Sequence, residues 1–307
     1  MVCCKGNFKV KIGRQAKKNQ NAILYLGDCR NLLSKLRSNS VDLVITSPPY
    51  CMGKVYEKTT KTEDFIKNHE EILPEIVRIT KKGGSICWQV GYHVKNGAVM
   101  PLDFLVHDIM KKIPETSLRN RIIWSYGHGL HCANRFSGRH EVILWYTKDH
   151  GKKHDEYFFN LDQIRVPQKY PGKRFYKGMK KGQFSGNPLG KNPSDVWDIP
   201  NVKANHPEKT NHPCQFPVAL AQRLIKGLSP KRGLVLDPFT GVGSTGVAAS
   251  IEKRRFIGAE INKGYYKRAF DRILKASKGD LKIRPMDKPV LKPNQNMSVA
   301  KKPKHYV

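Results

Sequence analysis

The sequence predicts an α/β protein built on a doubly wound, mostly parallel β-sheet with helices on both faces. Three observations support this prediction. Short apolar or β-branched runs alternate with segments of helical spacing along most of the 307-residue chain, which is typical of α/β sheets. A turn with two glycines, Gly241 and Gly243, separates one such run from a predicted helix. An acidic residue, Glu260, ends the next run, where it can hold a ribose.

In the first half of the chain, the spacing of apolar residues predicts strands over residues 23–26, 41–46, 85–90, 121–124 and 141–146. It predicts helices over residues 30–38, 63–80 and 102–113. Pro74 lies inside the second helix and predicts a kink, because proline cannot donate the helical hydrogen bond. Gly83 and Gly84 are expected to end that helix.

In the second half, an amphipathic helix over residues 216–228 is opened by Pro217 at a favoured first position. Strands are predicted over residues 234–236 and 255–260, with a helix over residues 244–251 between them. A last helix continues through Leu274.

The composition indicates a polyanionic partner. Lys and Arg number 56 against 25 Asp and Glu, a formal net charge of +31, and such an excess favours nucleic acid or an anionic membrane surface. No apolar run is long enough to span a bilayer, and the N-terminus lacks the apolar core of a signal peptide. The seven cysteines are scattered and form no Cys-x-x-Cys pair, so we predict no metal site and no disulfide framework.

Changes in composition divide the chain into five segments. They set off a basic N-terminal arm (1–20), residues 21–150, an irregular insertion (151–205), residues 206–278 and a flexible basic tail (279–307). Residues 163–194 hold eight basic residues and no acidic ones, interleaved with four aromatic residues, glycines and prolines. This irregular stretch is suited to nucleic acid.

Two motifs carry chemistry. The first, residues 237–245, reads Asp-Pro-Phe-Thr-Gly-Val-Gly-Ser-Thr between a strand and a helix. Its glycines let a ligand approach the backbone, and the helix N-terminus favours a carboxylate or phosphate. With Glu260, the pattern predicts a cofactor that carries a nucleoside. The second motif is Thr-Ser-Pro-Pro-Tyr at residues 46–50, where two prolines fix the backbone beyond a strand and Tyr50 offers a flat aromatic face.

Together these motifs resemble those of the DNA amino-methyltransferases over residues 20–275. Ser47 to Tyr50 matches the catalytic tetrapeptide Asp/Asn/Ser-Pro-Pro-Tyr/Phe, and Asp237 to Ser244 matches the cofactor loop. The catalytic motif precedes the insertion and the cofactor loop comes last, an order similar to the permuted beta class. The resemblance implies a seven-stranded Rossmann-like methyltransferase sheet, S-adenosyl-L-methionine as the cofactor and double-stranded DNA as the substrate. It also implies that residues 21–150 are the catalytic half, residues 151–205 the target-recognition insertion and residues 206–278 the cofactor-binding half.

The resemblance also implies the site residues. Catalysis is expected at Ser47, Pro48, Pro49 and Tyr50. The cofactor is expected at Asp28, Cys29, His212, Pro213, Gln215, Phe216, Asp237, Pro238, Phe239, Gly241, Gly243, Ser244, Thr245 and Glu260. DNA is expected at Arg135, His140, Lys169, Lys173, Arg174, Lys177, Lys180 and Lys181. In the implied mechanism the target base leaves the duplex and stacks on Tyr50, while Ser47 and the Pro48 carbonyl accept hydrogen bonds from its exocyclic amine.

The sequence leaves the identity of the target base open. A serine at the first tetrapeptide position resembles the members that methylate N4 of cytosine, and N6 of adenine is the alternative. Two other functions also remain open, an RNA methyltransferase and a DNA-binding protein that has lost catalysis, since the cofactor fold is shared. The class implies a cytoplasmic, nucleoid-associated monomer or homodimer, with a cognate restriction endonuclease as a candidate partner and no membrane.

Overall fold

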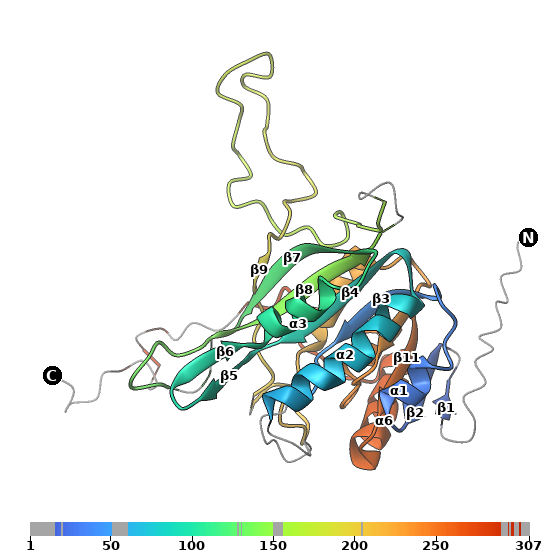
Figure 1. Ribbon diagram of the computed structural model, residues 1–307. Helices are drawn as coiled ribbons and strands as arrows, with labels where there is room; N and C mark the ends of the chain where they lie inside the picture. The colour runs from blue at the N-terminus through green and yellow to red at the C-terminus, as the bar shows by residue number, and fades with distance from the viewer. Residues whose placement is uncertain are drawn as a thin grey trace, which may run out of the picture.

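The computed structural model describes residues 16–19, 21–50, 61–127, 129, 131–149, 156–203 and 205–289, together with positions 294, 296, 297 and 301. Its centre is a nine-stranded sheet in the order β1-β2-β11-β10-β3-β4-β8-β7-β9 (Figure 1). The strands are β1 (Ala16–Lys18), β2 (Ala22–Leu26), β3 (Val41–Thr46), β4 (Thr80–Val90), β7 (Thr116–Ser125), β8 (His140–Lys148), β9 (Val196–Asp198), β10 (Leu234–Asp237) and β11 (Arg255–Glu260). A separate hairpin pairs β5 (Tyr92–Lys95) with β6 (Ala98–Pro101).

The sheet is parallel where the predicted site lies. Strands β2, β11, β10, β3 and β4 are all parallel, whereas β8 is antiparallel to β4 and β7 is antiparallel to β8. The seven strands from β2 to β7 in this order are those that the resemblance implied. The two three-residue strands β1 and β9 extend the sheet at its edges, and neither was predicted, because three residues give too short a period-two pattern.

Helices cover both faces of the sheet, as predicted. On one face lie α1 (Cys29–Leu33), α2 (Thr62–Ile79) and α3 (Leu102–Met110), and on the other α4 (Val218–Leu228), α5 (Ser244–Ile251) and α6 (Lys263–Lys278). Successive strand residues alternate between the two cores: Val44 packs with the first set of helices, and Leu43 and Ile45 with the second. This alternation follows from the period of two in a β-strand.

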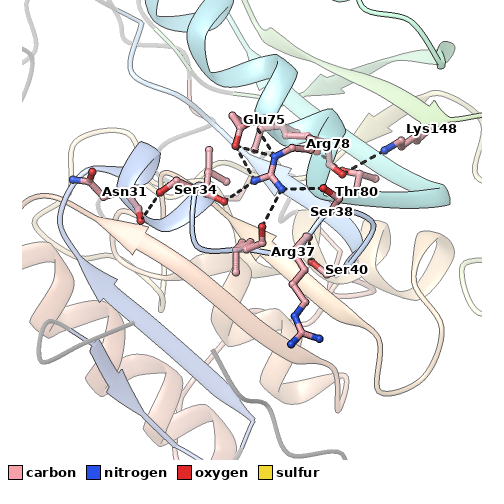
Figure 2. A network of polar contacts seen from close by, with 12 residues as sticks. Asn31, Ser34, Arg37, Ser38, Ser40, Glu75, Arg78, Thr80 and Lys148 are labelled. Carbon is pink, nitrogen blue, oxygen red and sulfur yellow. Dashed lines mark hydrogen bonds and ion pairs between the residues drawn. The ribbon is translucent and has the colours of Figure 1, made fainter. Parts of the chain in front are cut away.

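The first helix is shorter than predicted. Tight turns follow Leu33, and the guanidinium of Arg78, at the end of α2, donates to the backbone oxygens of Leu33 and Leu36 at 2.9 and 3.0 Å. These carbonyls are thereby satisfied without a further helical turn. In the same network, Lys148 at the end of β8 donates to the Arg78 carbonyl at 3.4 Å (Figure 2) and to the Val77 carbonyl at 2.9 Å. The network ties α1, α2 and β8 together at the amino end of β3.

We predicted that Gly83 and Gly84 end α2, and the structure shows that they do not. The helix ends at Ile79, runs without a break through Pro74, and passes into β4 at Thr80. The two glycines lie instead at a bulge in the pairing of β3 with β4, because Val41 pairs with Thr80 while Leu43 pairs with Ser85. Gly83 has φ +72°, and a Cβ at Gly84 would lie 2.8 Å from the Lys81 carbonyl oxygen, so both positions favour glycine.

The predicted tail is only partly separate from the body. Leu281, Ile283 and Met286 pack against the core beneath α4, α5 and α6, and the backbone N–H of Arg284 donates to Glu208 at 3.1 Å. Within the predicted tail, residues 281–286 therefore pack against the body, because apolar side chains recur there often enough to cover a core. Most of the predicted arm, and the tail from residue 290 onward apart from four positions, lie outside the described residues.

Candidate active site at the carboxyl ends of the parallel strands

The two motifs lie next to each other in space because their strands are neighbours. Strand β3 pairs in parallel with β10, so the Ser47-Pro48-Pro49-Tyr50 segment and the cofactor loop leave the same edge of the sheet. A hydrogen bond of 2.6 Å from the Thr46 hydroxyl to Asp237 joins the two strand ends directly. Residues almost two hundred positions apart in sequence thus form one site, at the strand ends where α/β sheets bind ligands.

Asp237 stabilises this junction from the interior of the protein. Its carboxylate is fully buried and accepts hydrogen bonds from Thr46, from the Thr245 hydroxyl at 2.7 Å and from the Phe239 backbone N–H at 3.1 Å. Burial raises the pKa of Asp237 to about 6, and these hydrogen bonds oppose the rise. Asp237 therefore shapes the loop from the interior of the protein and does not line the cavity. We had predicted a direct contact with the cofactor for it.

The cofactor loop brings its backbone close to Glu260, at the end of β11. Gly241 has φ +54°, and its N–H donates to Oε2 of Glu260 at 2.8 Å, while Oε1 accepts from the Asn262 N–H at 2.7 Å. Burial raises the pKa of Glu260 to about 7, against the effect of these two backbone donors. A Cβ at Gly241 would lie 3.4 Å from Nε2 of His212, so glycine leaves space for a ligand over the loop.

A cavity of about 610 Å³ opens between the two motifs, a size suited to a nucleoside-bearing ligand. All four residues of the catalytic tetrapeptide line it. Ten predicted cofactor residues line it as well, namely Asp28, Cys29, His212, Gln215, Phe216, Pro238, Phe239, Gly241, Ser244 and Glu260. The structure therefore brings most of the predicted site together around one space.

Four predicted cofactor residues lie outside that lining: Pro213, Asp237, Gly243 and Thr245. Gly243 is the N-cap of α5 in the left-handed region, and a Cβ there would lie 3.1 Å from the Ala269 backbone. Its role is close packing of two helices. Thr245 is buried and donates to Asp237, so it stabilises the loop from within.

Two polar side chains in the cavity wall were not predicted. His69 of α2 is 4% exposed and Trp88 of β4 is 1% exposed. Nδ1 of His69 lies 2.7 Å from the Phe65 carbonyl oxygen and so carries the proton, and burial lowers the pKa of this histidine to about 4. Within the described chain, the acceptor His69 Nε2 and the donor Trp88 Nε1 have no hydrogen-bond partner. Such groups fit a ligand with both donors and acceptors.

The side chains of the catalytic tetrapeptide belong to a chain of hydrogen bonds that extends to two further residues. The Ser47 hydroxyl lies 3.3 Å from the Tyr50 hydroxyl, which donates to Oε2 of Glu141 at 3.3 Å. Gln89 of β4 donates through Nε2 to the same Glu141 oxygen and, at 3.4 Å, to the Tyr50 hydroxyl. Neither Gln89 nor Glu141 was among the predicted catalytic residues, because they come from β4 and β8 and only strand pairing brings them to Tyr50.

The predicted DNA-binding residues lie apart from this cavity. Most belong to an exposed basic hairpin (residues 165–191), which is closed by bridges between Val166 and Lys191 and between Arg174 and Phe184. Figure 1 shows this segment, in yellow-green, standing clear of the sheet. Its exposed lysines are the predicted Lys169, Lys173, Lys177, Lys180 and Lys181, together with Lys191.

Arg174 differs from these lysines. Its guanidinium lies 4.0 Å from the centre of the Phe184 ring and donates to the Gly182 carbonyl at 2.5 Å. These contacts hold the hairpin together, and the DNA contact predicted for Arg174 stays a prediction. The other two predicted residues lie at the end of the sheet near the catalytic chain: His140 begins β8, and the Arg135 guanidinium is 5.8 Å from the Tyr92 ring centre.

Comparison with known proteins identifies the family. A DNA methylase family model, the N6 and N4 methyltransferases, matches residues 41–271, three quarters of the chain. The Type II methyltransferase M.BglII of Bacillus subtilis is 47% identical over 243 residues, which cover 79% of this chain and 66% of that protein. The DNA adenine methyltransferase YhdJ of Escherichia coli is 33% identical, covering 84% and 85% of the two chains. This chain belongs to the N6/N4 DNA methylase family.

Solved structures agree with this placement. The cytosine-N4-specific PvuII DNA methyltransferase superposes with a TM-score of 0.66 at 19% identity, covering 86% of this chain and 94% of that one, which supports the fold. A protein of Thermus thermophilus, described as a DNA modification methylase and complexed with S-adenosyl-L-methionine, superposes with a TM-score of 0.57 at 26% identity, covering 84% and 97%. The predicted class, an S-adenosylmethionine-dependent DNA methyltransferase, is confirmed.

Two further properties concern the described part of the chain. None of its helices combines the length and the apolar character needed to cross a membrane. Among the described residues, no group of three or more His, Cys, Asp or Glu side chains is placed so that it could hold a metal ion.

Proposed function

We propose that this chain transfers a methyl group from S-adenosyl-L-methionine to N4 of a cytosine flipped out of duplex DNA. The observation that carries the proposal is the single cavity lined both by the cofactor loop and by the Ser47 to Tyr50 segment. When bound, the cofactor supplies a methyl group on a positively charged sulfur. The unpaired polar atoms of His69 and Trp88, and the space over Gly241, fit a ligand of this kind.

The chain's own residues then act mainly by positioning. Glu260 accepts hydrogen bonds from the ribose hydroxyls, beside the Gly241 backbone. The ring of Tyr50 stacks on the extruded base, and the Ser47 hydroxyl and the Pro48 carbonyl accept from its exocyclic amine. These acceptors favour a more tetrahedral nitrogen, whose lone pair can point at the methyl carbon. No covalent intermediate with the protein is needed.

Ser47 supports cytosine as the target, because a serine at this position resembles the cytosine-amine members of the family. N6 of adenine is the second candidate, and the 33% identity to a DNA adenine methyltransferase favours it. A hydroxyl accepts from either amine. The similarity to a Type II methyltransferase supports a cognate restriction endonuclease as a partner.

The basic hairpin is proposed to contact the DNA outside the target base. It carries no acidic residue, and its six exposed lysines can neutralise backbone phosphates. Phosphate contacts position the enzyme and base-edge contacts specify the site. The fully exposed side chains of Met179, at the tip of the hairpin, and Phe136, near Arg135, are apolar surfaces that can pack against bases or sugars.

Single-molecule sequencing tests both the activity and the base. DNA is taken from a methylation-free host expressing the wild-type chain or the Ser47→Ala/Tyr50→Ala double variant. We expect one sequence motif with N4-methylcytosine in the wild type and none in the double variant. N6-methyladenine in the motif would establish the second candidate. DNA without any modification in the wild type would contradict the proposal and favour an RNA substrate or an inactive binder.

The single variant Tyr50→Ala separates chemistry from cofactor binding. Stacking of one base on an aromatic side chain contributes about 1–3 kcal/mol, so the loss of the ring alone lowers turnover roughly 5-fold to 150-fold. Cofactor affinity, measured by isothermal titration calorimetry, is expected to stay at the wild-type value. Unchanged turnover would remove Tyr50 from its assigned role.

A further inference from the structure

The catalytic serine has an ambiguity that a carboxylate would not have. A serine hydroxyl can either donate or accept a hydrogen bond, whereas an ionised carboxylate only accepts. Methyl transfer to an exocyclic amine requires an acceptor at this position, because the amine carries the N–H groups. Family members with aspartate at the first tetrapeptide position meet this requirement without help, and Ser47 does not.

The hydrogen bonds around Tyr50 resolve the ambiguity. A tyrosine hydroxyl has one proton, and the Tyr50 proton goes to the Glu141 carboxylate. The Tyr50 oxygen then accepts from Gln89 and, in the contact of 3.3 Å, from the Ser47 hydroxyl. With its own proton committed to Tyr50, Ser47 presents only lone pairs to the target amine.

The pairing of strands in the sheet places Glu141 beside Tyr50. Strand β8 pairs with β4, so that Gln89 lies opposite Ile143 and the residues beyond meet at the strand ends. Gly91 follows β4, and a Cβ there would lie 3.3 Å from the Tyr50 ring and 3.6 Å from Cγ of Glu141. The glycine lets the tyrosine and the carboxylate approach each other. Gln89 is buried, and its amide holds the carboxylate from the other side.

We propose that Glu141 is a positioning residue for methyl transfer, acting through the Tyr50 hydroxyl to make Ser47 the hydrogen-bond acceptor for the target amine and to receive the proton that the amine releases. The inference rests on the proposed transfer of a methyl group to an exocyclic amine. It assigns to a carboxylate on β8 the charge that the tetrapeptide of this chain lacks.

The proton transfer balances without another reactant. The amine nitrogen bonds to the methyl carbon as the carbon–sulfur bond breaks and its electron pair stays on sulfur. The nitrogen, now positively charged, gives a proton to Ser47 Oγ, whose own proton moves to the Tyr50 oxygen while the Tyr50 proton moves to Glu141. The products are a neutral methylated amine, restored Ser47 and Tyr50 hydroxyls, and a protonated Glu141 that then releases its proton to water.

A double-mutant cycle tests this chain of residues. The variants are Tyr50→Phe, which removes the hydroxyl and keeps the ring, Glu141→Gln, and the two together. The matched control is Glu70→Gln, the same chemical change at an exposed position of α2. Single-turnover methyl transfer is measured with the full chain on duplex DNA from the host used for the sequencing, and cofactor and DNA affinities are measured alongside.

We expect each single variant to slow methyl transfer at least tenfold, with cofactor and DNA affinities unchanged, as for loss of an acid–base interaction. The double variant should be no slower than the slower single variant, because both break the same chain. Glu141→Asp should recover part of the rate, and Glu70→Gln should match the wild type.

Three results would overturn the inference: a wild-type rate in Glu141→Gln, losses that multiply in the double variant, or a loss explained by weaker cofactor or DNA binding. If Glu141→Gln does not bind cofactor and so is misfolded, Tyr50→Phe and Glu141→Asp decide, and wild-type rates in both would contradict the relay. A wild-type chain that methylates no duplex DNA would instead refute the proposed function, so the two failures are distinct.

Discussion

The cofactor loop and the basic hairpin are both rich in glycine, yet they are held in opposite ways. The cofactor loop is fixed from behind by the fully buried Asp237, which receives three hydrogen bonds and joins β10 to β3. The basic hairpin is exposed over most of its length and is closed mainly by contacts among its own residues. One is built for a fixed geometry at a reacting centre, and the other for a large charged surface.

The comparison predicts its largest effect at Asp237. Asparagine has one acceptor oxygen instead of two, so Asp237→Asn leaves a buried donor of the loop unpaired. An unpaired buried donor costs about 1–3 kcal/mol, but the substitution also removes a buried charge that is unfavourable above its raised pKa. We therefore expect the free energy of unfolding to fall by about 1 kcal/mol. Urea unfolding followed by tryptophan fluorescence at pH 7.5, above the pKa of about 6 for Asp237, measures this.

Asp271→Asn is the control, at an exposed position of α6. It should change the free energy of unfolding by no more than about 0.5 kcal/mol. Equal stability of the two variants would mean that the buried junction does not hold the loop. We also expect weaker cofactor binding in Asp237→Asn, because the loop loses support from within.

The hairpin should show the reverse behaviour, with a large effect on DNA binding and none on folding. The triple variant Lys177→Ala/Lys180→Ala/Lys181→Ala removes three exposed positive charges. Each phosphate contact contributes about 0.9 to the slope of log affinity against log salt concentration, so the slope should become shallower by about 3. Fluorescence anisotropy with duplex DNA between 50 and 200 mM salt gives this slope.

Three exposed lysines of α6 form the matched control, Lys263→Ala/Lys267→Ala/Lys275→Ala. This variant has the same net charge as the hairpin variant but leaves the hairpin intact, so its slope should stay near the wild-type value. Similar slopes for the two triple variants would show that the overall positive charge, and not the hairpin, governs DNA binding.

The smallest expected effect concerns pH and Glu260, whose pKa burial raises to about 7. An ionised carboxylate accepts from ribose hydroxyls better than a protonated one. Since ionisation rises from about one tenth at pH 6 to about nine tenths at pH 8 for such a pKa, cofactor affinity should increase about ninefold. Calorimetric titration at the two pH values measures the change, and Glu260→Gln should abolish it.

Stability of the free protein should follow the opposite trend. The pKa of Glu260 is higher in the folded chain than in the unfolded chain, so its contribution to stability is present at low pH and decreases as the pH rises through about 7. A cofactor affinity that falls with pH, or the same pH dependence in Glu260→Gln, would remove Glu260 from the ribose site.

Sequence reasoning reached the parts of the site that lie at the carboxyl ends of parallel strands. The Ser47 to Tyr50 segment and the Gly241 loop follow apolar runs, and parallel strands place such ends at one edge. It could not reach the contact of Glu141 and Gln89 with Tyr50, because that contact depends on the register between β4 and β8. Nor could it show that Asp237 faces the protein interior, which depends on Thr46 and Thr245.

The self-contained hairpin has a consequence for how this family changes. Among the described hydrogen bonds, those made by residues 167–189 join that segment only to itself or to Gly190. Mutations there change an exposed charged surface without breaking any of the described hydrogen bonds of the core or of the Ser47–Tyr50–Glu141 chain. Selection can therefore remodel, or exchange between lineages, the segment that we propose contacts DNA, while the chemistry is inherited unchanged.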